Sequence, residues 1–290
     1  MTVTRFTTTH EITVAAEPQR LFDLVADPQG APRYSPAQMH AEVLEHGPDE
    51  DVLKRWVYGE RGLRAWTFRR AADRTALRID FTHVDPVAPV QHQRGTWTFR
   101  PTGDGGTLVR VQHVIDLTDP AAEAPLRAGF DQQIPAQLAG YRTVAELGDA
   151  LAERYVVGEE SGVVAGTVDE VRARLLGAEV WAVHHPGATG VTLTDLGDGA
   201  ALLDVDGAGA RYFWLRPNDT DIVHKSLTPP PGVHAQTGRW RLTPVGADKV
   251  EVAVRHTVTL PLAGGGPDPA TLREPVRAEL RRLLAALGRP

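Results

Sequence analysis

The sequence predicts an α+β protein made of two similar domains, each a curved antiparallel sheet around a long C-terminal helix. Two observations lead to this prediction. Residues 78–117 align with residues 221–260 without a gap, at an offset of 143 (221 − 78), and twelve of the forty positions are identical. In addition, each half reads as a strand, a short helix, about six further strands and a long helix. A repeat of this length indicates a duplicated domain and not a short-period solenoid.

Both halves carry the same spacing between a tryptophan and a histidine. Trp97 and His113 are sixteen residues apart, as are Trp240 and His256. We interpret all four as packing residues on late strands of the sheet, with ligand contact or catalysis as the alternative. The spacing therefore supports the duplication without itself defining a site.

Length and composition limit the classes of function. A chain of 290 residues is long enough for about two domains, which we place at 1–153 and 160–290 with a linker near 153–161. The net charge of −6 provides no basic surface for nucleic acid. The absence of cysteine excludes disulfides and thiolate metal ligands. No apolar run approaches the roughly 20 residues of a membrane span, and the N-terminus lacks an apolar signal core, so we expect a cytoplasmic protein.

Strand periodicity and turn residues predict the elements of the first half. Residues 11–15 form a first strand, and Pro18 at a first helical position opens a short helix. Gly47-Pro48-Asp49 turns the chain between two strands. The predicted meander strands are 41–46, 51–58, 63–71, 77–84, 95–101 and 107–117, and an apolar stripe over 126–144 predicts the closing helix.

The second half repeats this order. Residues 163–165 predict a strand, and Thr167 with Glu170 forms a capping box ahead of a short helix. A sheet that curls around one long helix encloses a cavity lined by every second residue of each strand. This helix-grip arrangement typically holds an apolar or amphipathic small molecule. The further elements are predicted near 189–194, 199–205, 209–215, 221–227, 237–243 and 249–260, with the closing helix at 272–287.

Five stretches resemble the two-domain aromatase/cyclases of bacterial type II polyketide synthases, in the START/Bet v 1-like (SRPBCC) superfamily. The resemblance implies tandem helix-grip domains and an antibiotic-pathway enzyme without a cofactor. It implies that an acyl carrier protein delivers a linear poly-β-ketone, which is closed by a regiospecific aldol reaction and dehydrated to an aromatic ring. A ketosynthase complex is a further expected partner, and the chain is expected to be a monomer or homodimer. The stretches are 10–14 (HEITV), 32–42 (PRYSPAQMHAE), 65–70 (AWTFRR), 93–97 (QRGTW) and 235–240 (AQTGRW).

The resemblance places a pocket arginine four residues after a tryptophan, which corresponds to Arg70 and Trp66. Alternate residues of a strand share a face, so Trp66, Phe68 and Arg70 are predicted to line the interior. A fixed guanidinium can stabilise the oxyanion of an aldol closure by roughly 3–4 kcal/mol. The alternative is that Arg70 is a surface charge beside Arg69.

A base or water-positioning group must accompany the arginine, because arginine stays protonated at neutral pH. Tyr34 and His92 are assigned to the catalytic group, and His40 is a further candidate by chemistry. Tyr58 is a candidate for the same role and is assigned to substrate binding. Gln93 is also assigned to substrate binding, with turn chemistry as its alternative.

A second pocket is predicted in the second half, where Arg216 takes the position of Arg70 if a three-residue deletion falls in the following turn. His184-His185 has no carboxylate cluster at ligand spacing, so no metal is assigned. The residues predicted to line this pocket are Tyr212, Trp214, Arg216, His224, His234 and Gln236.

Three departures from the resembled pattern leave two functions open. Ala31-Pro32 lacks the usual tryptophan, Phe68 replaces a small hydroxyl, and residues 133–135 (QIP) replace a polar stretch. These changes narrow the predicted pocket and remove polar contacts. The chain is therefore predicted to be either a polyketide cyclase/aromatase or a non-catalytic carrier of a hydrophobic polyketide or lipid-like intermediate.

Overall fold

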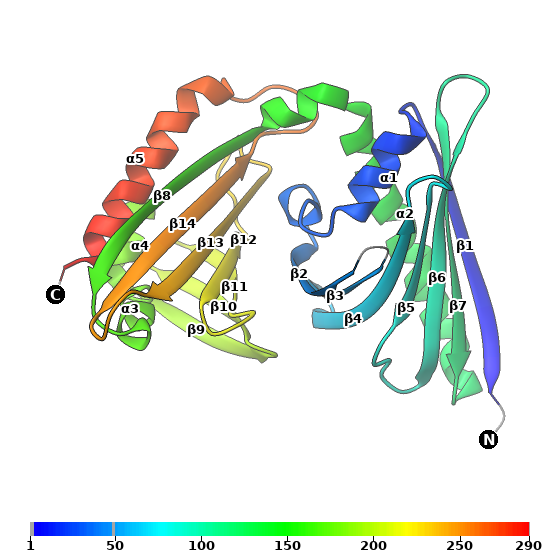
Figure 1. Ribbon diagram of the computed structural model, residues 1–290, viewed down its shortest axis with the longest axis horizontal. Coiled ribbons are helices and arrows are strands. Elements are labelled where there is room, and N and C mark those ends of the chain that lie inside the picture. The colour runs from blue at the N-terminus through cyan, green and yellow to red at the C-terminus, as the bar shows by residue number, and fades with distance from the viewer. Residues whose placement is uncertain (1–2, 48–49, 290) are drawn as a thin grey trace. The chain divides into compact units, whose positions relative to one another are not determined.

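The computed structural model describes residues 3–47 and 50–289, and the chain divides into two compact units, Met1–Asp149 and Ala150–Pro290 (Figure 1). Each unit contains one seven-stranded antiparallel sheet and one long C-terminal helix. The predicted fold class, a tandem pair of helix-grip domains, is confirmed. Of the expected turn at Gly47-Pro48-Asp49, the last two residues lie outside the described residues.

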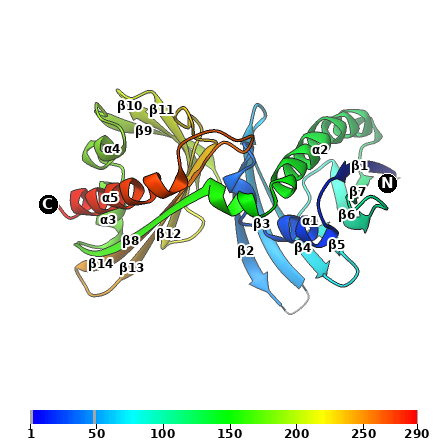
Figure 2. The same cartoon turned by 90° about the horizontal axis from the view of Figure 1, so that it is seen from above.

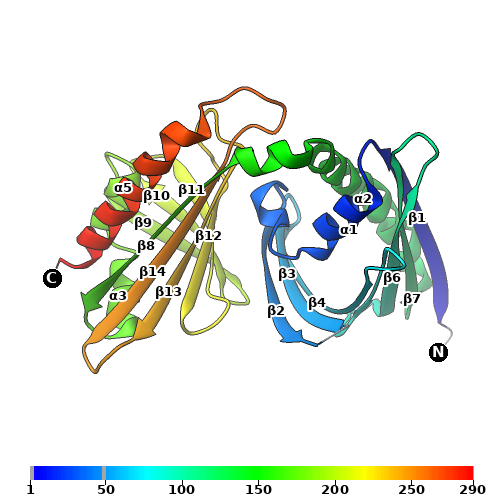
Figure 3. The same cartoon turned by 45° about the horizontal axis from the view of Figure 1, so that its top comes forward.

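The first unit is a meander whose first strand pairs with its last. The strand order is β1-β7-β6-β5-β4-β3-β2, and Figure 3 shows the sheet curving around α1. The elements are β1 (Thr4–Val14), α1 (Pro18–Ala26), the 3₁₀ turn η1 (Ala31–Arg33), β2 (Gln38–His46), β3 (Glu50–Gly59), β4 (Gly62–Asp73), β5 (Arg78–His83), β6 (Val90–Pro101), β7 (Thr107–Leu117), η2 (Pro120–Ala122), α2 (Glu123–Glu146) and η3 (Gly148–Arg154).

The second unit has the same strand order, β8-β14-β13-β12-β11-β10-β9, with a second short helix after the first (Figure 2). The linker expected near 153–161 is wrong, because β8 begins at Tyr155. The elements are β8 (Tyr155–Ala165), α3 (Val168–Arg174), α4 (Ala178–His184), β9 (Gly190–Gly197), β10 (Ala200–Asp206), β11 (Ala210–Leu215), β12 (Asp221–Ser226), β13 (Ala235–Pro244), β14 (Lys249–Thr259) and α5 (Pro269–Leu287).

Local sequence signals account for the helix ends. Pro18 occupies the first turn of α1, where a missing N–H costs no hydrogen bond. The predicted capping box at α3 is confirmed: the Thr167 side chain accepts from the Glu170 amide, and the Glu170 carboxylate accepts from the Thr167 amide. Both devices satisfy or avoid the unpaired N–H groups at a helix start.

Each long helix buries one apolar stripe against its own sheet. In α2 the stripe includes Leu138, Tyr141 and Val144, and in α5 it includes Leu280 and Leu283. All five are at most 4% exposed. Burying one such side chain contributes roughly 1.5–3 kcal/mol, so these stripes hold each helix on its sheet and define the inner face. Within the described residues, no helix is long and apolar enough to cross a membrane.

A glycine recurs at the same place in both sheets. Gly95 on β6 lies opposite His113, and Gly238 on β13 lies opposite His256, at equivalent positions of the sequence repeat. A Cβ at Gly95 would overlap the ring of Phe81, and a Cβ at Gly238 would overlap a ring from β12. The glycine is therefore required so that an aromatic ring can lie across the inner face.

Candidate functional site

Strand pairing in the first unit places a set of charged and aromatic side chains on the inner face of the sheet. On β4, Trp66 and Phe68 alternate with outward residues, and on β3 Arg55 lies directly opposite Trp66. Directly paired residues of antiparallel strands point to the same side. Tyr34 after η1 packs its ring against Tyr141 of α2 at 6.2 Å, so the helix side of the interior is also aromatic.

Arg70 lies on this inner face and is 6% exposed. Its Nε and Nη2 donate to the two carboxylate oxygens of Asp51 at 2.9 and 2.6 Å. Nη2 also donates to the carbonyl of Ala26 at 3.1 Å, and Nη1 donates to that of Val25 at 3.4 Å. Arg70 therefore ties β3, β4 and the end of α1 together, and its donors are directed at the protein. These contacts give Arg70 a structural role, and they do not support its assignment as the oxyanion-stabilising residue.

Arg64, on the inner face of β4, donates to Gln133 of α2 at 3.4 Å, whereas Arg55 has no carboxylate partner within residues 3–47 and 50–289. Its Nε is buried without a hydrogen bond, and its Cζ lies 5.4 Å from the centre of the Phe68 ring. Burial lowers the pKa of Arg55 from its ordinary value, although Tyr141 and Tyr34 act against this shift. Arginine nevertheless stays protonated at neutral pH, so a cation faces the interior with donors unused.

Arg55 was missed at the sequence level, although the signal was present. Gly59 pairs with Gly62 across a two-residue loop. Such a loop fixes the register of both strands, and counting back from it places Arg55 opposite Trp66. The resemblance favoured Arg70 because the family pattern specifies the spacing of two residues on one strand. It does not specify which residue of the neighbouring strand lies opposite Trp66.

His83 lies beside Arg55 and Phe68. Its ring stacks on the Phe68 ring, with centroids 5.9 Å apart and planes 30° apart. Burial, and then the charge of Arg55, lowers the pKa of His83 to about 4. The imidazole is therefore neutral at physiological pH and has a nitrogen lone pair available to accept a proton.

The other residues predicted for the first pocket are only partly on the inner face. Gln93 shares its face of β6 with Gly95 and is partly exposed, whereas His92 follows a bulge and is exposed. Tyr58 lies on the outer face of β3, because its parity is opposite to that of Arg55. The prediction therefore placed both residues on the wrong side. For His92 the cause is the bulge before it, and for Tyr58 it is the register of β3 against β4, which sets the side on which each residue points.

The predicted register of the second unit is wrong by two residues. Arg70 pairs with Phe81 in the first sheet, and Trp214 pairs with His224 in the second. Phe81 and His224 are equivalent in the repeat (224 − 81 = 143), so Trp214 takes the place of Arg70. Arg216 is exposed beyond the end of β11 and does not reach the interior. The connection that follows differs by one residue, not three.

The interior of the second unit is filled with rings. His185 Nε2 lies 2.8 Å from the Tyr212 hydroxyl, and Trp214 stacks on His224 with centroids 6.1 Å apart. Gln236 shares the face of β13 that carries Gly238 and is partly exposed, and His234 lies just before that strand. His185, which follows α4 and had no role assigned from the sequence, thus contacts the interior of the second unit.

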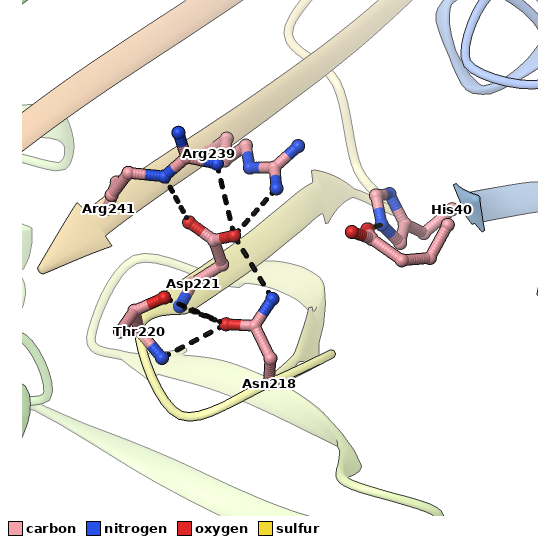
Figure 4. Close-up of polar contacts among 7 residues, drawn as sticks. His40, Asn218, Thr220, Asp221, Arg239 and Arg241 are labelled. Carbon is pink, nitrogen blue, oxygen red and sulfur yellow. Dashed lines mark hydrogen bonds and ion pairs between the residues drawn. The ribbon is translucent and has the colours of Figure 1, made fainter. Parts of the chain in front are cut away.

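The buried carboxylate of Asp221, at the start of β12, is hydrogen bonded to two arginines of β13 (Figure 4). Arg239 and Arg241 donate to the Asp221 carboxylate at 2.6 and 2.9 Å, and Asn218 donates to it at 3.1 Å. Burial opposes the charge, but the hydrogen bonds from Arg241, Arg239 and Asn218 hold the pKa of Asp221 below its ordinary value. The cluster is structural, because its donors are directed at Asp221.

Asp221 is expected to make stability depend on pH. A carboxyl whose pKa is depressed on folding stabilises the fold above its unfolded pKa of about 3.9 and loses that contribution as the pH falls further. Asp221→Asn is therefore expected to lower the melting temperature at neutral pH, with a gap to the wild type that narrows in acid. Thermal unfolding followed by circular dichroism across this range tests it. Asp219→Asn, at an exposed neighbour, is the control and should behave as wild type.

No group of three or more His, Cys, Asp or Glu side chains in the described part of the chain is arranged to hold a metal ion. The arrangement instead combines a cation, a neutral imidazole and aromatic walls on the inner face of a helix-grip sheet. This defines a class of small-molecule-binding protein whose interior suits a flat ligand and can stabilise negative charge on that ligand's oxygen.

Comparisons with known proteins place the chain within that class. Residues 5–146 match the family described as polyketide cyclase / dehydrase and lipid transport. The bifunctional cyclase/dehydratase of the actinorhodin polyketide synthase of Streptomyces coelicolor is 27% identical over 97% of this chain and 92% of its own length. The corresponding granaticin protein of Streptomyces violaceoruber is 27% identical over 97% and 89%.

Two solved structures are similar to this chain over almost its whole length. The di-domain aromatase/cyclase StfQ of the steffimycin pathway is 27% identical with a TM-score of 0.78, covering 97% of each chain. BexL, from the BE-7585A pathway, has a TM-score of 0.80 at 24% identity, covering 98% of this chain and all of its own, and shows the shared fold. The first unit matches the polyketide cyclase family, and the whole chain is similar to the di-domain aromatase/cyclases of type II polyketide synthases. It is a homologue of polyketide cyclase/dehydratase enzymes.

Proposed function

We propose that the protein is a bifunctional cyclase/dehydratase of aromatic polyketide biosynthesis. Its substrate would be a poly-β-ketone delivered on an acyl carrier protein. The protein would direct one aldol closure of this chain and the loss of water that makes the ring aromatic. The observation that carries the proposal is Arg55, a cation without a carboxylate partner among the described residues, which faces an aromatic interior. The names of relatives that align over almost the whole chain support the same reaction class.

The chemistry of ring closure requires a base and an anion-stabilising group. A methylene between two carbonyls loses a proton, the enolate carbon attacks a ketone of the same chain, and the new alkoxide takes up a proton. Arg55 would stabilise the oxygen that becomes negative, since a preorganised donor in a site with little water acts most strongly on developing charge. His83 is neutral at physiological pH and, as a base weakened by burial, would pass the methylene proton on to water and not retain it.

The aromatic side chains would select the folded form of the substrate. Trp66 and Phe68 border Arg55 on β4, while Tyr34 packs on Tyr141 across the interior. Flat walls favour a chain bent into the plane of the future ring, because enol and diketone units stack on aromatic faces. Phe68, which occupies the place of a hydroxyl residue in the resembled pattern, would add such a wall and would not donate a hydrogen bond.

Reconstitution tests the proposal. A minimal ketosynthase, acyl carrier protein and malonyl donor are combined with and without this protein, and the products are profiled by mass spectrometry. The expected result is a shift from a mixture of spontaneously cyclised products to one aromatic product. If the polyketide binds but the product distribution does not change, the protein is a carrier and the proposal is wrong.

A further inference from the structure

The inner faces of the two units carry different chemistry at equivalent positions. Leu53 pairs with Phe68 in the first sheet, and Leu203 pairs with Tyr212 in the second, which aligns β3 with β10 and β4 with β11. The charged set of the first unit is thereby replaced by uncharged side chains. In this alignment Ala201, Val205 and Trp214 stand in place of Asp51, Arg55 and Arg70.

The second unit has three neighbouring histidines on its inner side. His184, at the end of α4, is hydrogen bonded through Nδ1 to the Glu279 carboxylate of α5. The His184 ring lies 5.5 Å from that of His256 on β14, which lies 5.7 Å from that of His224 on β12. His256 is the repeat of His113, but His224 takes the place of a phenylalanine. The histidine pair of β12 and α4 is therefore specific to this unit.

His224 and His256 are buried and uncharged. Burial, and then His184, lowers the pKa of His256 to about 3, and burial lowers that of His224 well below its ordinary value. His224 Nδ1 and His256 Nε2 have no hydrogen-bond partner within the described chain. Buried polar atoms without partners are rare in folded proteins and mark sites for a ligand or water.

A small cavity adjoins them. It has a volume of about 10 Å³ and is bordered by His184, His224 and three tryptophans, Trp181, Trp214 and Trp240. This space suits about one water molecule. Trp181 also stacks on His185 and donates its indole N–H to the carbonyl of Leu175 at 3.0 Å, so these two contacts fix one wall of the cavity.

We propose that the second unit holds its own proton-transfer site, in which His184 is the base that dehydrates the cyclised ring and Glu279 is its positioning residue. The inference rests on the proposed function. With Nδ1–H directed at the carboxylate, the lone pair of Nε2 accepts the proton α to the carbonyl. The C–H electrons form the C=C bond, the C–O bond breaks, and the imidazolium returns the proton to the departing hydroxide, which leaves as water.

The division of labour between the units follows from this. The first unit presents a guanidinium, which stabilises an oxyanion but does not accept a proton, beside one weakly basic histidine, His83. The second presents neutral imidazoles without a guanidinium at the equivalent positions, which suits proton removal and return. Ring closure and dehydration would then depend on different residues of one chain.

The test separates the two steps by mass, because the undehydrated ring is heavier than the aromatic product by one water. In the reconstituted synthase, His184→Gln is expected to keep the rate of ring closure and to lower the rate of dehydration by about 100-fold. Dehydration at the wild-type rate in a folded His184→Gln protein would overturn the inference. Loss of ring closure in the wild type itself would refute the proposed function instead.

Glu279→Gln supplies a readout that a purely structural role would not change. It retains the shape of the side chain, and it removes the carboxylate that stabilises the imidazolium, so the acid limb of the dehydration rate is expected to move to lower pH. An unshifted limb contradicts the positioning role. Glu274→Gln, at an exposed position of the same helix, is the matched control. The groups that face this pair are His185 just after α4, Tyr212 on β11, His224 on β12, His256 on β14 and Arg282 on α5.

Discussion

Arg55→Met is expected to slow ring closure by about 100- to 1,000-fold while the protein stays folded. Methionine keeps the apolar part of the side chain against Phe68 and removes only the guanidinium. Because no carboxylate of the described residues pairs with Arg55, its loss leaves no counter-charge buried. The rate of formation of the cyclised product in the reconstituted synthase measures the effect, and circular dichroism checks the fold.

The matched control is Arg69→Met, at the neighbouring position of Arg70 on β4. The Arg69 side chain is 53% exposed and lies within 4 Å of Glu45 and Glu50 at the surface, where ion pairs contribute little. This variant is expected to cyclise at the wild-type rate. A normal rate for Arg55→Met would show that another group stabilises the oxyanion, and the role proposed for Arg55 would be wrong.

Arg70→Met is expected to lower the free energy of unfolding by about 3 kcal/mol, which is the scale for removing one partner of a buried ion pair. The substitution removes two guanidinium hydrogen bonds to the Asp51 carboxylate and the hydrogen bonds to the carbonyls of Val25 and Ala26. Urea denaturation of the purified variant measures this loss.

A double variant, Arg70→Met with Asp51→Leu, separates the charge from the packing. It removes both charges, so it is expected to recover much of the lost stability. If instead Arg70→Met is as stable as the wild type and fails to cyclise, Arg70 acts on the substrate and its pairing with Asp51 is incidental.

The repeat and the side-chain periodicity were enough to predict the fold. Twelve identities at one offset defined the duplication, and the apolar stripe that includes Leu280 and Leu283 predicted the closing helix of the second unit. The linker was wrong because β8 starts at Tyr155 with Val156 fully buried but continues through Glu159 and Glu160, which read as a polar connection. On a strand with one exposed face, such polar residues are compatible with pairing.

The site was predicted only in part, because its chemistry depends on partners that are distant in sequence. Arg70 and Asp51 are 19 residues apart, and only the pairing of β3 with β4 shows that each neutralises the other. Likewise, Arg216 was aligned by residue type, whereas the ladder between β11 and β12 puts Trp214 at that place. A shift of two residues preserves the face of a strand and is therefore invisible to periodicity.

A glycine occupies equivalent positions of β6 and β13, and the ring that lies opposite it differs between the two units. Because Gly95 and Gly238 have no side chain, the inner surface beside each is a shallow socket sized for one planar ring. Phe81 fills it in one copy and His224 in the other, with the same backbone register around both. One substitution there turns an inert wall into a titratable group without repacking the strands, so duplicated copies of this fold can acquire different reactions while each keeps the same scaffold.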